Sequence, residues 1–126
     1  MGKLKAVVID DESGVSLLMK ELLTQDGFEV FTFANAIEAF KVVENEHIDI
    51  FFVDYLLPGM RGDHFIQEIR QQGHQSPVIL MTGLSKMQVK ESSESTYQDV
   101  LEKPFSIKDV MDLIDQHVRK RQHYNV

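Results

Sequence analysis

The chain has 126 residues, a formal net charge of −7 and no cysteine, and its longest fully apolar runs have only four residues. One domain of this length buries roughly two-thirds of its unfolded surface, so it needs no disulfide or structural metal to fold. The lack of cysteine excludes thiol nucleophiles and Cys-ligated metals, the acidic charge argues against direct nucleic-acid binding, and the short apolar runs exclude a signal peptide or membrane span.

Near the N-terminus the sequence predicts a strand followed by an amphipathic helix. Residues 6–9 are apolar and are followed at once by the acidic residues 10–12. Apolar side chains then recur with the period of a helix that buries one face. These side chains are Val15, Leu18, Met19, Leu22 and Leu23. We expect the helix to end at Gly27.

A second strand, a second helix and a third strand are predicted next. Residues 28–33 have the composition of a strand. Asn35 with Glu38 is typical of a capping pair and predicts a helix that buries three apolar side chains. These are Ile37, Phe40 and Val43. Residues 50–53 are continuously apolar, as in a parallel strand covered on both faces, and they end at Asp54.

The second half of the chain repeats this alternation. Asp63 is the expected N-cap of a helix with a buried apolar face, Phe65, Ile66 and Ile69. Strands at 78–81 and 100–101 are followed by Thr82 and by Lys103, and a last helix begins at Ser106. Five strands that alternate with helices predict an α/β domain with an open parallel sheet.

The segment between residues 84 and 98 breaks the pattern. A fourth helix is expected there, but the apolar residues form no stripe. Several of its residues, Ser92, Ser93, Ser95 and Thr96, are unfavourable in a helix interior. We therefore predict a short or irregular fourth helix.

Polar side chains stand at the ends of four of the five predicted strands, at Asp10, Asp11, Asp54, Thr82 and Lys103. The carboxyl ends of parallel strands meet at one edge of a sheet, so these groups are expected to converge there. Each group alone is more simply a cap, a turn residue or a solvated charge, but the set is much more specific. Crowded carboxylates must be protonated, paired or bridged by a cation, and oxygen ligands without His or Cys favour Mg²⁺.

Four motifs resemble the receiver domains of two-component response regulators, over about residues 5–117. They are Val-Ile-Asp-Asp-Glu at 8–12, Asp-Tyr-Leu-Leu-Pro-Gly-Met-Arg-Gly at 54–62, Met-Thr-Gly at 81–83 and Glu-Lys-Pro-Phe at 102–105. The resemblance implies a flavodoxin-like (βα)5 fold, doubly wound, with strand order 2-1-3-4-5. It also implies one receiver domain over 1–126, with a core at about 4–118 and a C-terminal tail at 119–126.

The resemblance implies a role for each residue of the site. Asp54 is the expected phospho-acceptor and nucleophile. Mg²⁺ would be bound directly by Asp11 and Asp54, through a water by Asp10, and by the backbone carbonyl of Leu56. We interpret Glu12 more simply as a first-turn acid favoured by the helix dipole than as a metal ligand.

Two further residues of the family pattern bind the phosphoryl group. Lys103 is expected to pair with Asp54 and then with the phosphoryl group, and Thr82 to donate its hydroxyl to a phosphoryl oxygen. The resemblance also implies a cis peptide before Pro104, which the energetics of X-Pro bonds permit.

The sequence departs from the family pattern at the switch position, where Val100 replaces the usual aromatic residue. Valine has no ring to follow Thr82 inward on phosphorylation, and Tyr97 lies at the wrong offset to replace one. Two interpretations stay open: an ordinary receiver with a short fourth helix, or an output that uses order–disorder of residues 84–98.

Leu56 and Leu84 lie two residues after Asp54 and Thr82, where the family resemblance implies that side chains flank the attacking water. Both are apolar and neither can orient a water. They predict slow hydrolysis of the acyl phosphate.

Three function classes remain. The favoured one is a signalling phospho-acceptor that catalyses its own phosphorylation and slow dephosphorylation, rather than an enzyme acting on a separate substrate. The alternatives are a receiver-like interaction module that takes no phosphate and a small Mg²⁺-dependent aspartyl phosphatase.

The expected setting is the cytoplasm, with no direct contact to nucleic acid or membrane. A histidine kinase or histidine phosphotransferase is the expected partner, and a downstream protein target and a phosphorylation-dependent homodimer are further candidates. The chain could be a stand-alone protein or part of a longer one.

Overall fold

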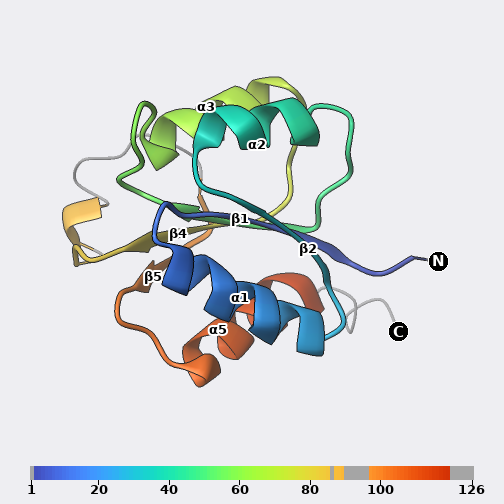
Figure 1. Ribbon diagram of the computed structural model, residues 1–126, viewed down its shortest axis with the longest axis vertical. Helices are drawn as coiled ribbons and strands as arrows, with labels where there is room; N and C mark the ends of the chain where they lie inside the picture. The colour runs from blue at the N-terminus through green and yellow to red at the C-terminus, as the bar shows by residue number, and fades with distance from the viewer. Residues whose placement is uncertain (1, 86, 90–96, 120–126) are drawn as a thin grey trace.

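The protein, described from a computed structural model over residues 2–85, 87–89 and 97–119, is built on one five-stranded parallel sheet (Figure 1). Its strands are β1 (Lys5–Ile9), β2 (Glu29–Phe33), β3 (Ile50–Asp54), β4 (Val78–Thr82) and β5 (Asp99–Glu102). The strand order is β2-β1-β3-β4-β5, which confirms the prediction.

Helices cover both faces of the sheet (Figure 1). One face carries α2 (Ala36–Val43) and α3 (Gly62–Gln71), and the other carries α1 (Ser13–Gln25) and α5 (Ile107–Ile114), which continues into the π-helical turn η1 (Asp115–Arg119). Residues 87–89 are also helical, and the rest of the expected fourth helix lies outside the described residues. Among the described helices, none combines the length and apolar character that crossing a membrane requires.

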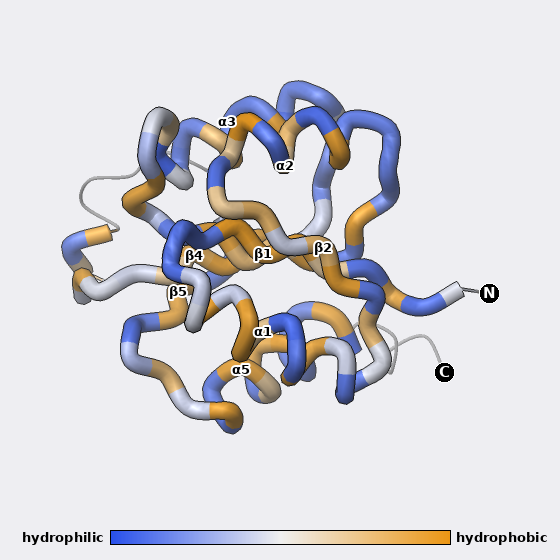
Figure 2. The backbone as a smooth tube through the Cα atoms, in the orientation of Figure 1, coloured by the Kyte–Doolittle hydropathy of each residue, from blue (hydrophilic) through white to orange (hydrophobic). Residues whose placement is uncertain are grey.

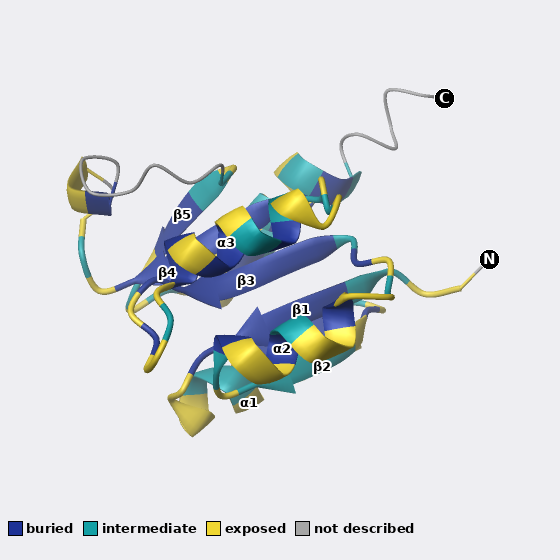
Figure 3. Ribbon diagram, turned by 90° about the horizontal axis from the view of Figure 1, so that it is seen from above, coloured by how far each residue is buried: buried dark blue, intermediate teal, exposed yellow. Residues whose placement is uncertain are grey.

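The central strands are buried on both faces, as their continuous apolar sequences predict. Every residue of β3 and β4 is buried, and Figure 3 shows β1, β3 and β4 in the colour of buried residues. Their alternating side chains supply two apolar clusters, one beneath each helical layer, and Figure 2 shows the apolar strands between two amphipathic layers. The sheet is therefore a rigid platform for the residues that follow its strands.

Most side chains predicted on the buried faces of α1 and α2 are buried or pack against the core, but two are exposed. Ile37 was expected in the core but is 53% exposed, because α2 directs Ala36, Ala39 and Val43 inward. Leu18 of α1 was likewise expected on the buried face and is 43% exposed. Small alanines that face the sheet allow close packing, and a pattern that counts only large apolar residues misses them.

The predicted caps were confirmed at two helices and wrong at a third. The Asn35 side chain accepts a hydrogen bond from Glu38 N (2.9 Å), and Ser106 forms a capping box with Asp109. Asp63 is not an N-cap: α3 begins at Gly62, and Asp63 lies buried in its first turn, paired with Arg61.

Candidate functional site

The site is built on the carboxyl ends of β1 and β3, which are neighbours in the sheet. Ile9 at the end of β1 pairs with Val53, so Asp10 and Asp54 follow at nearly the same level. The chain beyond Asp54 stays tied to the sheet, because Tyr55 N donates a hydrogen bond to Met81 O (2.9 Å). The two aspartates are 1% and 6% exposed. Each carboxylate is therefore held at the sheet edge with little access to bulk water.

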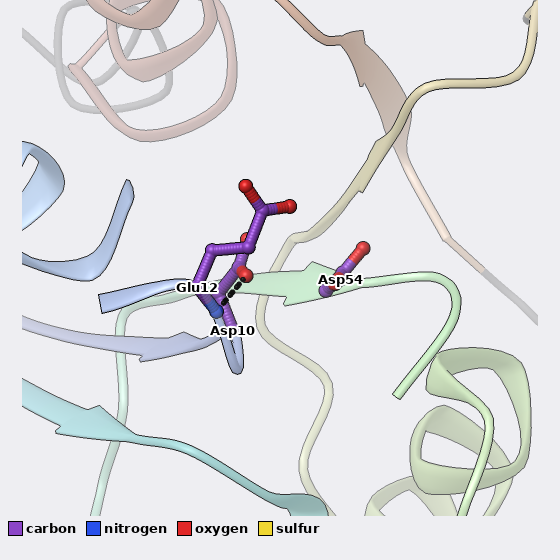
Figure 4. A group of neighbouring side chains, drawn as sticks. All are labelled: Asp10, Glu12 and Asp54. Carbon is purple, nitrogen blue, oxygen red and sulfur yellow. Dashed lines mark hydrogen bonds between the residues drawn. The ribbon is translucent and has the colours of Figure 1, made fainter. Parts of the chain in front are cut away.

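Three carboxylates meet at this edge, those of Asp10, Glu12 and Asp54 (Figure 4). One carboxylate oxygen from each residue lies within 4.8 Å of the others. Glu12 is fixed relative to Asp10, because its backbone N–H donates to Asp10 Oδ1 (2.9 Å). The predicted convergence of Asp10 and Asp54 is therefore seen in the structure, with Glu12 in addition.

Lys103 joins the three carboxylates. Its Nζ lies 2.8 Å from Asp10 Oδ2, 3.1 Å from Glu12 Oε1 and 3.6 Å from Asp54 Oδ1. Lys103 reaches this position from the loop after β5, where its peptide bond to Pro104 is cis, as expected. One ammonium thus opposes three carboxylates, so the site keeps an excess of negative charge.

Burial and the neighbouring charges shift the pKa values of Asp54 and Lys103. Burial raises the pKa of Asp54 from 3.8 to about 6, and the charge of Asp10 adds to this effect. Burial acts to lower the pKa of Lys103, but hydrogen bonds to Asp10 and Glu12 outweigh it and raise that pKa. Lys103 therefore stays charged, whereas ionised Asp54 is held in an unfavourable environment that a second cation would relieve.

The donor set fits a hard divalent cation. Asp10 Oδ2 is buried, and the Lys103 ammonium lies 2.8 Å from it. Oxygen donors of this kind are those that Mg²⁺ prefers. Asp11 is exposed and lies outside the group of three carboxylates, but its charge acts on Asp54.

Two further predicted site residues are Thr82, at the end of β4, and Leu56, in the loop after β3. Thr82, at the end of β4, is 2% exposed, and its Oγ1 accepts a hydrogen bond from Leu84 N (2.9 Å). The hydroxyl can still donate its own proton to another acceptor. The backbone N–H of Leu56 donates to the Asp54 carboxylate, while the Leu56 side chain is 59% exposed.

The loop after β3 approaches Asp54 closely at Gly62. A Cβ atom at this position would lie 2.4 Å from the backbone oxygen of Asp54, so a side chain there would displace the strand end. Gly62 N also donates to Tyr55 O (2.9 Å). This glycine ends the motif at 54–62, but the sequence did not indicate its contact with the strand.

The switch position is filled by aliphatic packing. Val100 is buried (3% exposed) in the apolar cluster beneath α2 and α3, and Tyr97 packs against the same cluster from the segment before β5. Burial, and to a lesser extent Tyr55, raises the pKa of the Tyr97 hydroxyl. The order–disorder hypothesis concerns residues 84–98, of which residues 86 and 90–96 lie outside the described part of the chain.

The Glu12–Lys103 contact was missed by sequence reasoning. Glu12 is the N-cap residue of α1 rather than a first-turn acid, and its side chain makes no capping hydrogen bond. It lies 91 residues from Lys103 in the sequence, so no local pattern indicates their pairing.

Comparisons with known proteins agree on one family. The model of the response regulator receiver domain matches residues 6–115. The chain is 27% identical over 115 residues to sporulation initiation phosphotransferase F of Bacillus subtilis (strain 168), covering 90% of this chain and 93% of that protein. Other curated relatives are longer, and the chain spans about a quarter to a half of their length.

Solved structures share the fold. The receiver domain of the sensor histidine kinase PA1611 of Pseudomonas aeruginosa PAO1, with a magnesium ion coordinated in its active-site cleft, has a TM-score of 0.83 at 22% identity. The alignment covers 93% of this chain and 98% of that one. The BeF₃-activated receiver domain of DrrB has a TM-score of 0.82 at 25% identity, with 94% and 99% covered.

Proposed function

The chain belongs to the response regulator receiver domains of two-component systems, and from this premise we propose that it accepts a phosphoryl group on Asp54. The observation that carries the proposal is the position of Asp54: it is buried at the end of the central strand β3, beside Asp10 and 3.6 Å from the Lys103 ammonium. The donor we propose is a phosphohistidine of a histidine kinase or a histidine phosphotransferase.

The transfer is a direct displacement at phosphorus. An oxygen of the ionised Asp54 carboxylate attacks, the new P–O bond forms, and the P–N bond of the phosphohistidine breaks. Its electron pair returns to the imidazole nitrogen of the donor. Because little covalent chemistry is required of the protein, its contribution is position and charge.

Each side chain has a defined part in this transfer. Asp10, Asp11, Asp54 and the Leu56 carbonyl are the proposed groups that hold Mg²⁺. When bound, the ion neutralises charge on the transferred phosphoryl oxygens. Lys103 supplies a second positive charge at the same place. Thr82, whose hydroxyl can donate, binds a phosphoryl oxygen.

The partners of the proposed reaction are proteins in the same compartment, which we propose is the cytoplasm. The curated relatives of this chain include DNA-binding transcriptional regulators, and the chain spans about a quarter of their length. We propose that phosphorylation of this domain changes its contacts with another protein or with a second copy of this chain.

The proposal is tested by incubation with a small acyl phosphate and Mg²⁺, followed by intact mass spectrometry. We expect the gain of one phosphoryl group, which is lost in Asp54→Asn and greatly slowed without Mg²⁺. No gain in the wild type would contradict the proposal and favour an interaction module that takes no phosphate. Rapid turnover of unrelated phosphate esters would instead favour the aspartyl phosphatase.

A further inference from the structure

Glu12 differs from the other carboxylates that contact Lys103. The Asp10 and Asp54 side chains are 0% and 9% exposed, whereas that of Glu12 is 62% exposed. Asp10 and Asp54 are fixed at strand ends. Glu12 contacts the same ammonium from the rim of the site, and its longer side chain has room to move with it.

Under the proposed function, Lys103 and a divalent cation would compete for the same carboxylate oxygens. Lys103 Nζ lies 2.8 Å from the buried Asp10 Oδ2 and 3.6 Å from Asp54 Oδ1. A divalent cation held by the acidic residues of the site would repel the ammonium from this position. Of the three carboxylates around Lys103, Glu12 alone would then remain to hold it.

The backbone of Glu12 is well placed for such a role. Its N–H donates to Asp10 Oδ1 (2.9 Å), which fixes the residue beside the site. Although Glu12 is the N-cap residue of α1, its side chain makes no hydrogen bond to the helix, and its carboxylate is instead directed to Lys103. The contact links the loop after β1 to the loop after β5.

We propose that Glu12 is a positioning residue for Lys103, an inference that rests on the proposed function. Its carboxylate would anchor the ammonium at the rim of the site when Asp10, Asp11 and Asp54 hold the metal. Lys103 then remains within reach of the phosphoryl group that arrives at Asp54. Glu12 itself binds neither the metal nor the phosphoryl group.

The proposal and simple electrostatics predict opposite changes in anion affinity when Glu12 loses its charge. Loss of a negative charge next to an anion should tighten anion binding if Glu12 acts only through its charge. Loss of the anchor should weaken binding, because Lys103 no longer stays in place. The probe is beryllofluoride at saturating Mg²⁺, and its affinity is measured by calorimetry.

The experiment compares Glu12→Gln, Lys103→Met and the double variant with the wild type. Glu21→Gln is the matched control, since Glu21 is an exposed residue of α1 and its loss changes the net charge equally. We expect Glu12→Gln to weaken beryllofluoride binding about 5- to 10-fold, within the range of coupling between residues in contact. We expect no further weakening in the Lys103→Met background, and no change in Glu21→Gln.

The Mg²⁺ affinity of the same variants separates positioning from ligation. We expect Glu12→Gln to change it by about threefold or less, because an exposed charge is well screened. Unchanged or tighter beryllofluoride binding in Glu12→Gln would overturn the inference. It would also be overturned if Glu12→Gln weakened beryllofluoride binding as much in the Lys103→Met variant as in the wild type. A loss of Mg²⁺ affinity of about tenfold or more in that background would make Glu12 a ligand instead. Failure of the wild type to bind beryllofluoride would refute the proposed function itself, and the inference with it.

Discussion

Replacement of Asp54 by asparagine removes a buried negative charge and keeps the shape of the side chain. In the metal-free protein, burial and the charge of Asp10 raise the pKa of Asp54 from 3.8 to about 6. The Asp54 carboxyl therefore contributes favourably to the free energy of unfolding when the pH is below its unfolded-state pKa of 3.8. This contribution is lost as the pH rises through the folded-state pKa of about 6. A shift of roughly two units corresponds to about 3 kcal/mol.

We therefore expect metal-free Asp54→Asn to be more stable than the wild type above about pH 7, by as much as about 3 kcal/mol. This gain in stability should disappear at about pH 4, where the folded wild type already carries a protonated Asp54. Mg²⁺ should reduce the difference in free energy of unfolding between the variant and the wild type. A ligand that binds only the folded state stabilises it, and the variant, which has lost one oxygen ligand, gains less from this effect.

The assay is urea unfolding in the presence of a chelator at several pH values. Asp112→Asn is the control, because Asp112 is an exposed carboxylate that forms an i,i+4 pair with Lys108. Its loss should change the free energy of unfolding by about 0.5 kcal/mol or less. The reasoning is refuted if Asp54→Asn is no more stable than the wild type above about pH 7, or if its gain does not depend on pH.

Three further changes test the site. Gly62→Ala should destabilise the fold by about 1 kcal/mol or more and slow phosphorylation, because the added Cβ would lie 2.4 Å from Asp54 O; wild-type values in both assays would contradict this. Thr82→Ala should slow phosphorylation about tenfold or more without changing the Mg²⁺ affinity, because a hydrogen-bond donor to the phosphoryl group is lost; an equal loss of Mg²⁺ affinity would point to the metal site instead. Leu56→Asn should hasten loss of the acyl phosphate several-fold, because an amide can orient the attacking water; the prediction fails if the dephosphorylation rate, followed by intact mass, stays unchanged.

The sequence was sufficient to predict the sheet and the residues at its edge. Continuously apolar runs such as 50–53 can hardly be anything but buried strands, and the geometry of a parallel sheet then brings Asp10 and Asp54 together. These predictions succeed because they depend on local composition and on one general rule of topology. The strand order followed from the family resemblance.

The errors and omissions have a common origin in tertiary packing. The phase of α2 is set by alanines against the sheet, so Ile37 faces solvent although its sequence position suggested the core. The contact of Glu12 with Lys103 joins residues 91 positions apart. The approach of Gly62 to Asp54 O depends on the path of a loop. None of these has a periodic signature in the sequence.

The most direct test of the proposed function is to locate the phosphoryl group after reaction with a small acyl phosphate and Mg²⁺. Borohydride reduces an aspartyl phosphate to homoserine, which peptide mass spectrometry identifies by position. We predict homoserine at Asp54, and none in a sample that was never exposed to the donor. Homoserine at Asp10 or Asp11, or at no position in a protein that is otherwise folded, would contradict the assignment of Asp54 as the phospho-acceptor.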